Sequence, residues 1–308
     1  MPVPIIYTTD LYHPHQDPDD HFDLATLFAM REFDIRAIVI DRGEGGADRP
    51  GIVAVEQMAA ITRRQAPCAL GMIQNVPWHG YIPDGELDGV NPIIDALRRS
   101  EQPVTIFTTG SLRDVAAAYL REPELFQRRV ERLYINAGHS SGKDEWNVKL
   151  EPWAYFRMLR AHLPIYWMPC FGDGGFQTYW NFRQGDVLER APLAVQNYIV
   201  YALSKTSPRE VDPIRALERP IPEDVKEKFW SMKRNMWCTA GFLHAAGRKN
   251  GAFSFVKKRV VLDESAQTTT LSSNGGGLEL MTFHQEDAGA YTQSMTGALR
   301  DLLAGLAS

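Results

Sequence analysis

The chain has 308 residues, a hydrophobic content of 44%, a charged content of 23% and a net charge of −5. This composition predicts a globular protein with a large hydrophobic core. The acidic balance and the lack of a long basic run exclude nucleic acid from the expected partners. No apolar stretch has the length of a membrane span, so we expect no membrane partner either.

The N-terminal residues and the cysteines indicate the compartment. Residues 1–6, MPVPII, lack the basic region and the long apolar run of a secretory signal peptide. The three cysteines, Cys68, Cys170 and Cys238, are far apart and odd in number. They predict neither a disulfide framework nor a zinc site of the CxxC type. We therefore expect a cytoplasmic protein.

The first half of the chain alternates strand and helix patterns. Short apolar or β-branched runs predict strands, and apolar spacing of three or four predicts helices. The expected strands are 3–7, 35–40, 67–70, 104–108, 132–135 and 165–168, and the expected helices are 20–30, 52–62, 93–98, 112–120 and 152–161. This alternation predicts an open, mostly parallel, Rossmann-like α/β sheet flanked by helices.

The alternation weakens after Asp173. Helices are expected at 191–203 and 223–237, joined by a proline-rich connection, and a closing helix at 291–303. Strands are expected at 253–262 and 278–283, with the polar, glycine-rich stretch 268–277 as a loop or hairpin turn. We predict a single domain over 1–308, in which approximately 176–237 is a helical insertion near the pocket.

Polar residues follow four of the predicted strands. They fall in residues 10–20, 41–44, 108–110 and 136–147. Ligands of an open α/β sheet bind at the carboxyl ends of its strands, so these residues are expected to meet at one rim. Carboxylates gathered there repel one another unless protons or a cation intervene. Oxygen ligands in this number favour Ca²⁺ or Mg²⁺ over zinc, while His13 and His15 add a competing imidazole signal.

Each of these features also has a purely structural interpretation. Asp17, Asp19 and Asp20 precede a helix, where acidic residues commonly cap the first turn. Histidines in a polar loop are more often exposed than metal-bound, and Trp146 more often belongs to a core than to a ligand site. The spacing alone leaves a metal site and an acidic cap equally open.

Taken in order, the pieces resemble the inosine-uridine-preferring nucleoside hydrolase family. Residues 5–10, IIYTTD, are similar to its opening strand and first Asp, and Asp19-Asp20 to the Asp-Asp pair that starts the next helix. Residues 104–116, VTIFTTGSLRDVA, are similar to its strand and Thr-Gly helix start. Residues 135–155, INAGHSSGKDEWNVKLEPWAY, are similar to the stretch with Glu-Phe-Asn, and residues 78–80, WHG, to its His-Gly.

The resemblance implies a hydrolase that cleaves the N-glycosidic bond of a nucleoside or related ribosyl compound. In the family a calcium ion holds a water and the ribose 2′- and 3′-hydroxyls, and the first Asp, here Asp10, acts as general base on that water. The implied metal ligands are Asp10, Asp19, Asp20 and the carbonyl of Thr109, with Ca²⁺ as the ion and Mg²⁺ as the alternative. The implied substrate contacts are Glu44, His79, Glu145, Trp146, Asn147 and Trp237. Self-association into a homo-oligomer is also implied.

Three departures from the family pattern bear on the substrate. The loop from Leu11 to Pro18 is five residues longer than the family turn. The family's late His-Asp pair, a leaving-group acid and a calcium ligand, falls at residues 235–238, NMWC, where neither partner is present. The family asparagine after the second strand falls near Glu44, which would restore one negative charge, and Asp173 is the alternative substitute. A non-catalytic binder of a sugar or nucleoside, and a hydrolase of a non-nucleoside glycoside, therefore remain alternative functions.

Overall fold

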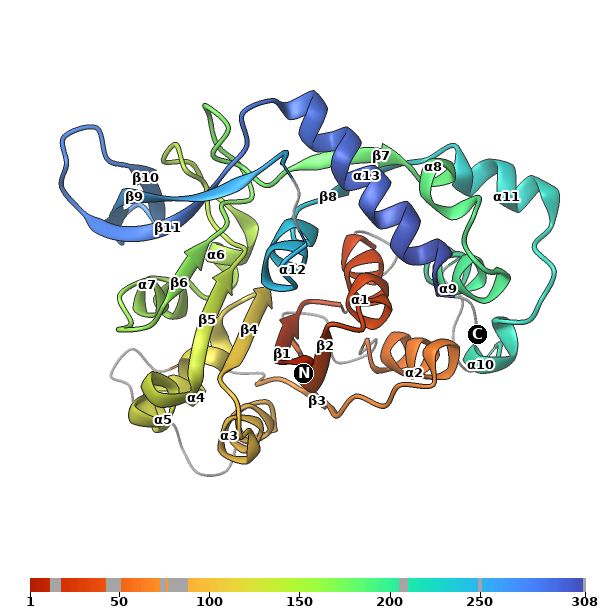
Figure 1. Ribbon diagram of the computed structural model, residues 1–308, viewed down its shortest axis with the longest axis horizontal. Helices are drawn as coiled ribbons and strands as arrows, with labels where there is room; N and C mark the ends of the chain where they lie inside the picture. The colour runs from red at the N-terminus through yellow and green to blue at the C-terminus, as the bar shows by residue number, and fades with distance from the viewer. Residues whose placement is uncertain are drawn as a thin grey trace.

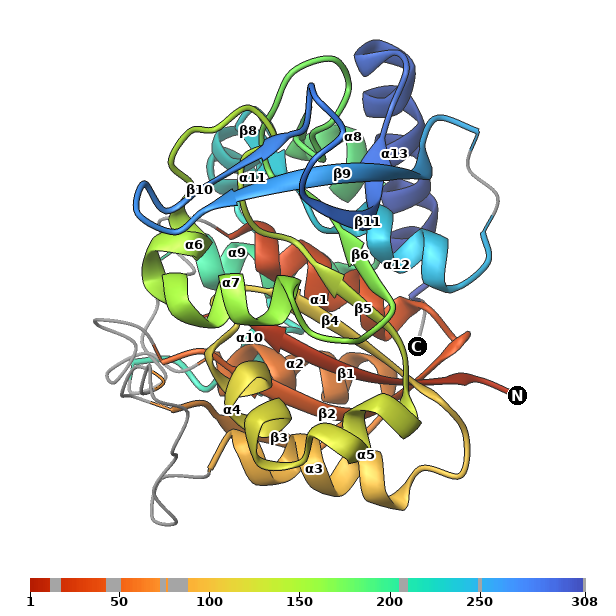
Figure 2. The ribbon, with the colours of Figure 1, turned by 90° about the vertical axis from the view of Figure 1, so that its left-hand side faces the viewer.

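A computed structural model describes residues 1–11, 18–42, 51–72, 76, 88–204, 210–248 and 251–306. Within these residues the main sheet has nine strands in the order β10-β9-β11-β6-β5-β4-β1-β2-β3 (Figures 1 and 2). Six neighbouring pairs, from β11–β6 to β2–β3, run parallel, and only β9 pairs antiparallel, with β10 and β11. The predicted open and mostly parallel sheet is confirmed. The strands are β1 (Val3–Thr9), β2 (Phe33–Ile40), β3 (Cys68–Leu70), β4 (Val104–Thr109), β5 (Val130–Ile135), β6 (Ile165–Trp167), β9 (Ser254–Asp263), β10 (Thr268–Leu271) and β11 (Leu278–His284).

Helices pack on both faces of the sheet because the central strands are apolar on both sides. Ile5 and Tyr7 of β1 point to one face, and Ile6 between them points to the other. The first face is covered by α1 (Asp19–Ala29), α2 (Ile52–Thr62), α9 (Leu193–Leu203), α12 (Thr239–Ala245) and α13 (Ala288–Ala304). The second is covered by α3 (Val90–Arg99), α4 (Arg113–Arg121), α5 (Pro123–Arg129) and α7 (Pro152–Leu159) (Figure 1). No helix in the described part of the chain is long and apolar enough to cross a membrane.

The segment predicted as a helical insertion contains helices bounded by a small sheet. Its helices are α8 (Gln184–Leu188), α9, α10 (Pro213–Ala216) and α11 (Glu223–Trp230). Its first and last elements, β7 (Trp180–Arg183) and β8 (Lys233–Met236), pair antiparallel as a two-stranded sheet. The helix α12 follows β8 closely, and its Phe242 ring contacts Tyr7 of β1 and Phe107 of β4.

Several predicted elements were wrong. The helix expected over 223–237 ends at Trp230, and Arg234 and Met236 alternate with exposed neighbours as β8. The loop expected over 268–277 begins with β10, which gains its partner β9 only in the folded chain. The helix α5, the strand β7 and the short helix α6 (Trp146–Leu150) were not predicted.

Candidate functional site

Asp10 and Thr109 lie side by side at the carboxyl ends of two paired strands. Asp10 follows β1 directly, and Thr109 ends β4, where it is paired with Thr9. A side chain on Gly110 would place its Cβ 2.9 Å from the Asp10 backbone nitrogen. Only glycine permits this close approach, so the turn after β4 positions Asp10 at the rim.

The start of α1 brings a second carboxylate against Asp10. The Oδ1 atom of Asp20 accepts hydrogen bonds from the Tyr7 hydroxyl at 3.1 Å and from the Thr109 hydroxyl at 3.0 Å. Burial raises the pKa of Asp10 well above its usual range, and so do the charge of Asp20, a hydrogen bond with Asp20 and the charge of Asp41. Two buried carboxylates this close favour a shared proton or a bound cation.

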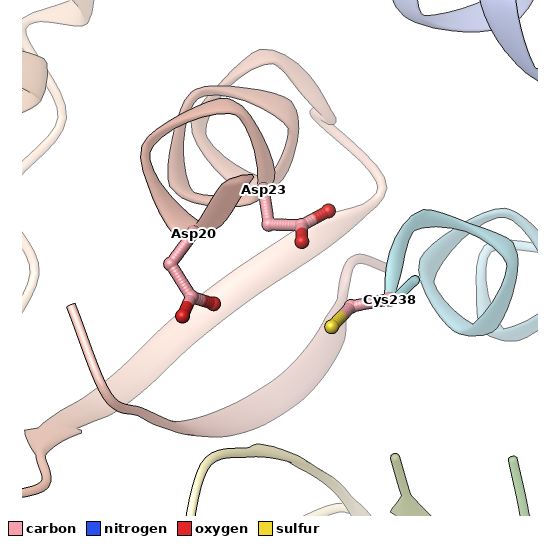
Figure 3. A group of neighbouring side chains, drawn as sticks. All are labelled: Asp20, Asp23 and Cys238. Carbon is pink, nitrogen blue, oxygen red and sulfur yellow. The ribbon is translucent and has the colours of Figure 1, made fainter. Parts of the chain in front are cut away.

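Asp23 and Cys238 complete a compact group of ligand atoms around Asp20. Their oxygen and sulfur atoms all lie within 4.8 Å of one another, and all three residues are buried (Figure 3). Asp23 stands one helical turn after Asp20, and Cys238 precedes α12. The Oδ1 atom of Asp23 accepts a hydrogen bond from Thr239 at 2.9 Å, while its buried Oδ2 has no partner within the described residues. Burial, followed by the charge of Asp20, raises the pKa of Asp23 well above its usual range.

The pKa shifts of two cysteine thiols indicate that Asp19 lies near Asp20 and Asp23. Burial raises the pKa of the Cys238 thiol well above its usual range, and the charges of Asp23, Asp20 and Asp19 add to the effect. The pKa of the Cys170 thiol is raised by burial first, and then by acidic neighbours that include Asp19. Asp19 therefore acts on both thiols, although its side chain lies outside the compact group of Asp20, Asp23 and Cys238.

The predicted substrate contact Glu145 is engaged with the backbone. As the N-cap of α6, its carboxylate accepts from the amides of Gly138 at 2.8 Å, Asn147 at 3.0 Å and Val148 at 3.2 Å. These contacts fix the loop after β5. Trp146 is 63% exposed and begins α6.

Asn136 follows β5 directly, and its side chain is buried. Its amide nitrogen donates to the Met168 carbonyl at 2.8 Å and to the Thr178 hydroxyl at 3.1 Å. Its buried Oδ1 has no partner in the described parts of the chain. Asn147 donates to the backbone carbonyl of Asn136 at 3.4 Å. The Asn136 Oδ1 atom is therefore a buried acceptor at this rim without a hydrogen-bond partner among the described residues.

An aromatic cluster adjoins Cys238 through Trp237. The Trp237 ring centre lies 5.8 Å from that of Phe171 and 5.7 Å from that of Tyr179. Phe171 is 38% exposed and stacks on the His139 ring at 6.2 Å. Burial lowers the pKa of His139, and its Nδ1 accepts from the Ser141 amide at 3.1 Å, so the neutral ring carries its hydrogen on Nε2. Aromatic faces of this kind suit a flat base or a sugar ring.

A buried ion-pair network lies behind the rim after β2. Asp41 accepts from the Ser111 amide at 3.0 Å and from Arg113 at 3.2 Å. Arg113 also lies 3.5 Å from Glu151. This network holds the loop after β2 against the start of α4.

The structure thus brings together part of the predicted site. Asp10, Asp20 and Thr109 are in contact, and Asp19 is close by. The predicted contacts Glu44 and His79, together with His13, His15 and Asp17, lie outside the described residues. Asp23 and Cys238 were missed as site residues. The spacing of Asp23, three residues after Asp20, was the available signal, since such residues share a helix face.

Comparison with known proteins assigns the chain to a protein family. The sequence model for "inosine-uridine preferring nucleoside hydrolase" matches residues 6–172. The chain belongs to this family. It is 26% identical over 191 residues to the pyrimidine-specific ribonucleoside hydrolases RihA of Citrobacter koseri and of Escherichia coli O1:K1. Each match covers 54% of this chain and 59% of the relative, so the chain spans about three fifths of the length of these nucleoside hydrolases.

Solved structures of nucleoside hydrolases show the same fold. A plant nucleoside hydrolase covers 97% of this chain, and the chain covers 99% of it, with a TM-score of 0.64 and 14% identity. The effector protein XopQ, solved in complex with adenosine diphosphate ribose, has a TM-score of 0.61 and 12% identity, with 98% of this chain and 95% of XopQ covered. The inosine-uridine-preferring family fold therefore extends beyond the matched residues 6–172.

Proposed function

We propose that this chain hydrolyses the N-glycosidic bond of a ribosyl compound, with Asp10 as the general base. The observation that carries this proposal is the contact of Asp10 with Asp20, and of Asp20 with Thr109, at the carboxyl ends of β1 and β4. Membership of a nucleoside hydrolase family supports the choice of bond. The neighbouring structures include a purine-preferring ribonucleoside hydrolase and a protein complexed with adenosine diphosphate ribose, which supports a ribosyl substrate.

The residues at the rim fit a divalent cation. Asp10, Asp19, Asp20 and the main-chain carbonyl of Thr109 would hold it, and Ca²⁺ or Mg²⁺ is the ion that such oxygens favour. The raised pKa values of Asp10 and Asp23 show that burial and neighbouring carboxylates make their negative forms unfavourable without a nearby positive charge. A bound cation would supply positive charge that neutralises these carboxylates and lowers the pKa of a nearby water.

The protein groups then have separate tasks. Asp10, once ionised, accepts a proton from the water that attacks the anomeric carbon. The Tyr7 and Thr109 hydroxyls hold the Asp20 carboxylate in place. We propose that Asn147, Trp146 and the loop fixed by Glu145 contact the ribose, and that Trp237 with its aromatic neighbours holds the leaving group.

A second candidate function is binding without turnover. The observation that favours it is the sequence of residues 235–238, NMWC, where the family resemblance implies the late His-Asp pair and where this chain has neither a histidine nor an aspartate. An acid at that position contributes typically about a hundredfold or more to the rate. Without it, the same rim and aromatic cluster would still bind a nucleoside or a sugar.

The two functions are separated by one set of measurements. The purified chain, after metal analysis, is incubated with purine and pyrimidine nucleosides and with short glycosides, and release of the free sugar is followed. The proposed hydrolysis predicts ribose release that EDTA abolishes, that added divalent cation restores and that Asp10→Asn removes. Tight nucleoside binding without sugar release, in a metal-loaded preparation, would identify the chain as a binder. Release of sugar only from the short glycosides would identify a different glycosidase.

A further inference from the structure

The compact group of Asp20, Asp23 and Cys238 contains a sulfur atom, which cations such as Ca²⁺ and Mg²⁺ do not prefer as a ligand. Figure 3 shows the carboxyl group of Asp23, from α1, and the thiol of Cys238, from the start of α12, directed toward the space between them, with Asp20 beside it. The three ligand atoms lie within 4.8 Å of one another and are buried. Bonds of about 2.0–2.3 Å at tetrahedral angles place two ligands of one zinc ion about 3.3–3.8 Å apart. Side-chain rotations that draw the three atoms closer would bring them onto one ion.

We propose that Asp23 and Cys238 join Asp20 as ligands of the divalent cation of the proposed function, and that the thiolate makes this site select zinc-like ions over Ca²⁺ and Mg²⁺. Thiolates prefer borderline and soft ions such as Zn²⁺ and Co²⁺, whereas Ca²⁺ and Mg²⁺ take oxygen ligands. The inference rests on the proposed function for the location of the ion. It differs from the expectation of Ca²⁺ because the position after Trp237 carries a sulfur atom.

The hydrogen bonding of Asp23 leaves one oxygen for the ion. Thr239 donates to Oδ1 at 2.9 Å, whereas Oδ2 is buried and has no hydrogen-bond partner within the described residues. No lysine or arginine in the described chain forms an ion pair with Asp23. A carboxylate buried in this way is costly unless a cation or proton neutralises it. The Thr239 hydroxyl would orient the carboxylate, as outer hydrogen bonds do for metal ligands.

Cation binding at this site has a simple proton balance. The Cys238 thiol loses its proton to solvent, and the sulfur lone pair forms the bond to the metal. Asp20 and Asp23 contribute one negative charge each, so the two carboxylates and the thiolate carry three charges against the two of the ion. The alternative is that Cys238 and Thr239 are only neutral hydrogen-bond donors to Asp23. That alternative predicts no metal–sulfur bond.

The test is a titration of the metal-free full chain with CoCl₂, followed by absorption spectroscopy. A cobalt–thiolate bond gives a near-ultraviolet charge-transfer band that cobalt bound only to oxygen lacks. We expect this band in the unaltered chain and in the Cys68→Ser control, and its loss in Cys238→Ser. Calorimetric titration with ZnCl₂ and CaCl₂ is expected to show tighter zinc binding, and a loss in zinc affinity of about tenfold or more in Cys238→Ser. Cys238→Asp is expected to weaken Zn²⁺ binding and strengthen Ca²⁺ binding.

Three results would overturn the inference. They are a cobalt spectrum without the thiolate band, a band that survives in Cys238→Ser but disappears in Cys170→Ser, and equal affinity for Zn²⁺ and Ca²⁺. The unaltered chain alone supplies the first and third of these results, so a poorly folded variant does not block the test. None of these measurements uses a nucleoside. A chain that binds cobalt through Cys238 but releases no ribose would retain this inference and refute the proposed hydrolysis.

Discussion

Replacing Asp114 by Asn should change the pH dependence of stability more than it changes the fold. Asp114 lies in the first turn of α4, is buried, and accepts a hydrogen bond from the Met72 amide at 2.9 Å. Its carboxyl is so tightly enclosed that a Cβ on Gly71 or Gly89 would lie 2.3 or 2.1 Å from its oxygens. Burial, followed by the charge of Asp41, raises the pKa of Asp114 to about 7. Asn has nearly the same shape and still accepts from Met72.

The direction and size of the effect follow from this shift. Below pH 3.8 the carboxyl is protonated in both the folded and the unfolded chain, so it contributes no pH dependence. Between pH 3.8 and about 7 the folded state retains a proton that the unfolded state has lost, so stability falls as pH rises. A difference of about three pKa units corresponds to about 4 kcal/mol. Asp114→Asn should remove this fall, so the variant should gain up to about 4 kcal/mol relative to the unaltered chain between pH 4 and pH 8.

Urea unfolding at pH values from 4 to 8 measures this difference. The free energy of unfolding of each protein is obtained at each pH by linear extrapolation. Asp88→Asn, at an exposed aspartate, is the matched control and should follow the unaltered chain. The reasoning would be refuted if Asp114→Asn and the unaltered chain lost stability in parallel across this range. That result would mean that Asp114 is ionised in the folded chain already at low pH.

Four further outcomes are expected. Asp10→Asn should lower kcat for ribose release by about a hundredfold or more, with a circular dichroism spectrum like that of the unaltered chain. Metal removal should lower the melting temperature, and a cation at a hundred times its Kd should restore about 2.7 kcal/mol of stability, measured by urea unfolding. Trp237→Ala should raise KM for nucleosides about tenfold at a similar kcat, and Trp237→Phe should raise it less, because ring contacts are worth up to about 1.5 kcal/mol. Burial lowers the pKa of His244 to about 4, so the chain should lose stability as pH falls from 6.5 toward 4, and His244→Gln should lose less in the same unfolding assay.

The parallel part of the fold could be predicted because its signal is local. Strands buried on both faces are continuous apolar runs, and the helices between them carry regular apolar spacing. β10 could not be predicted in this way, since three of its four residues, TTTL, are threonines, and they form a strand by pairing with β9. There Thr269 is buried and donates to the His139 carbonyl at 3.1 Å. The strand β8 could not be predicted for a similar reason, because its partner β7 lies some fifty residues earlier in the chain.

The candidate site also contains residues that local sequence patterns predict and residues that they do not. Asp10, Asp20 and Thr109 could be expected to meet, because parallel strands end at one rim and the next helix begins there. Cys238 could not, since its neighbour Thr239 lies 216 positions from Asp23, and no periodicity connects positions so far apart. The role of Glu145 was also invisible in the sequence. Its carboxylate accepts hydrogen bonds from three backbone amides, and these amides come together only when the loop after β5 folds.

Asp23 and Cys238, which were not predicted as site residues, are best understood together as one exchange of metal ligands. The family resemblance implies a carboxylate in a His-Asp pair within residues 235–238, just before α12, and this chain has NMWC there. Asp23 places a carboxylate on the opposite side of the same space, from α1, with its ligand atom within 4.8 Å of the Cys238 sulfur. In the proposed site the negative charge available to a cation is retained, while one oxygen ligand becomes sulfur. Such an exchange would alter which ion is bound more than whether an ion is bound.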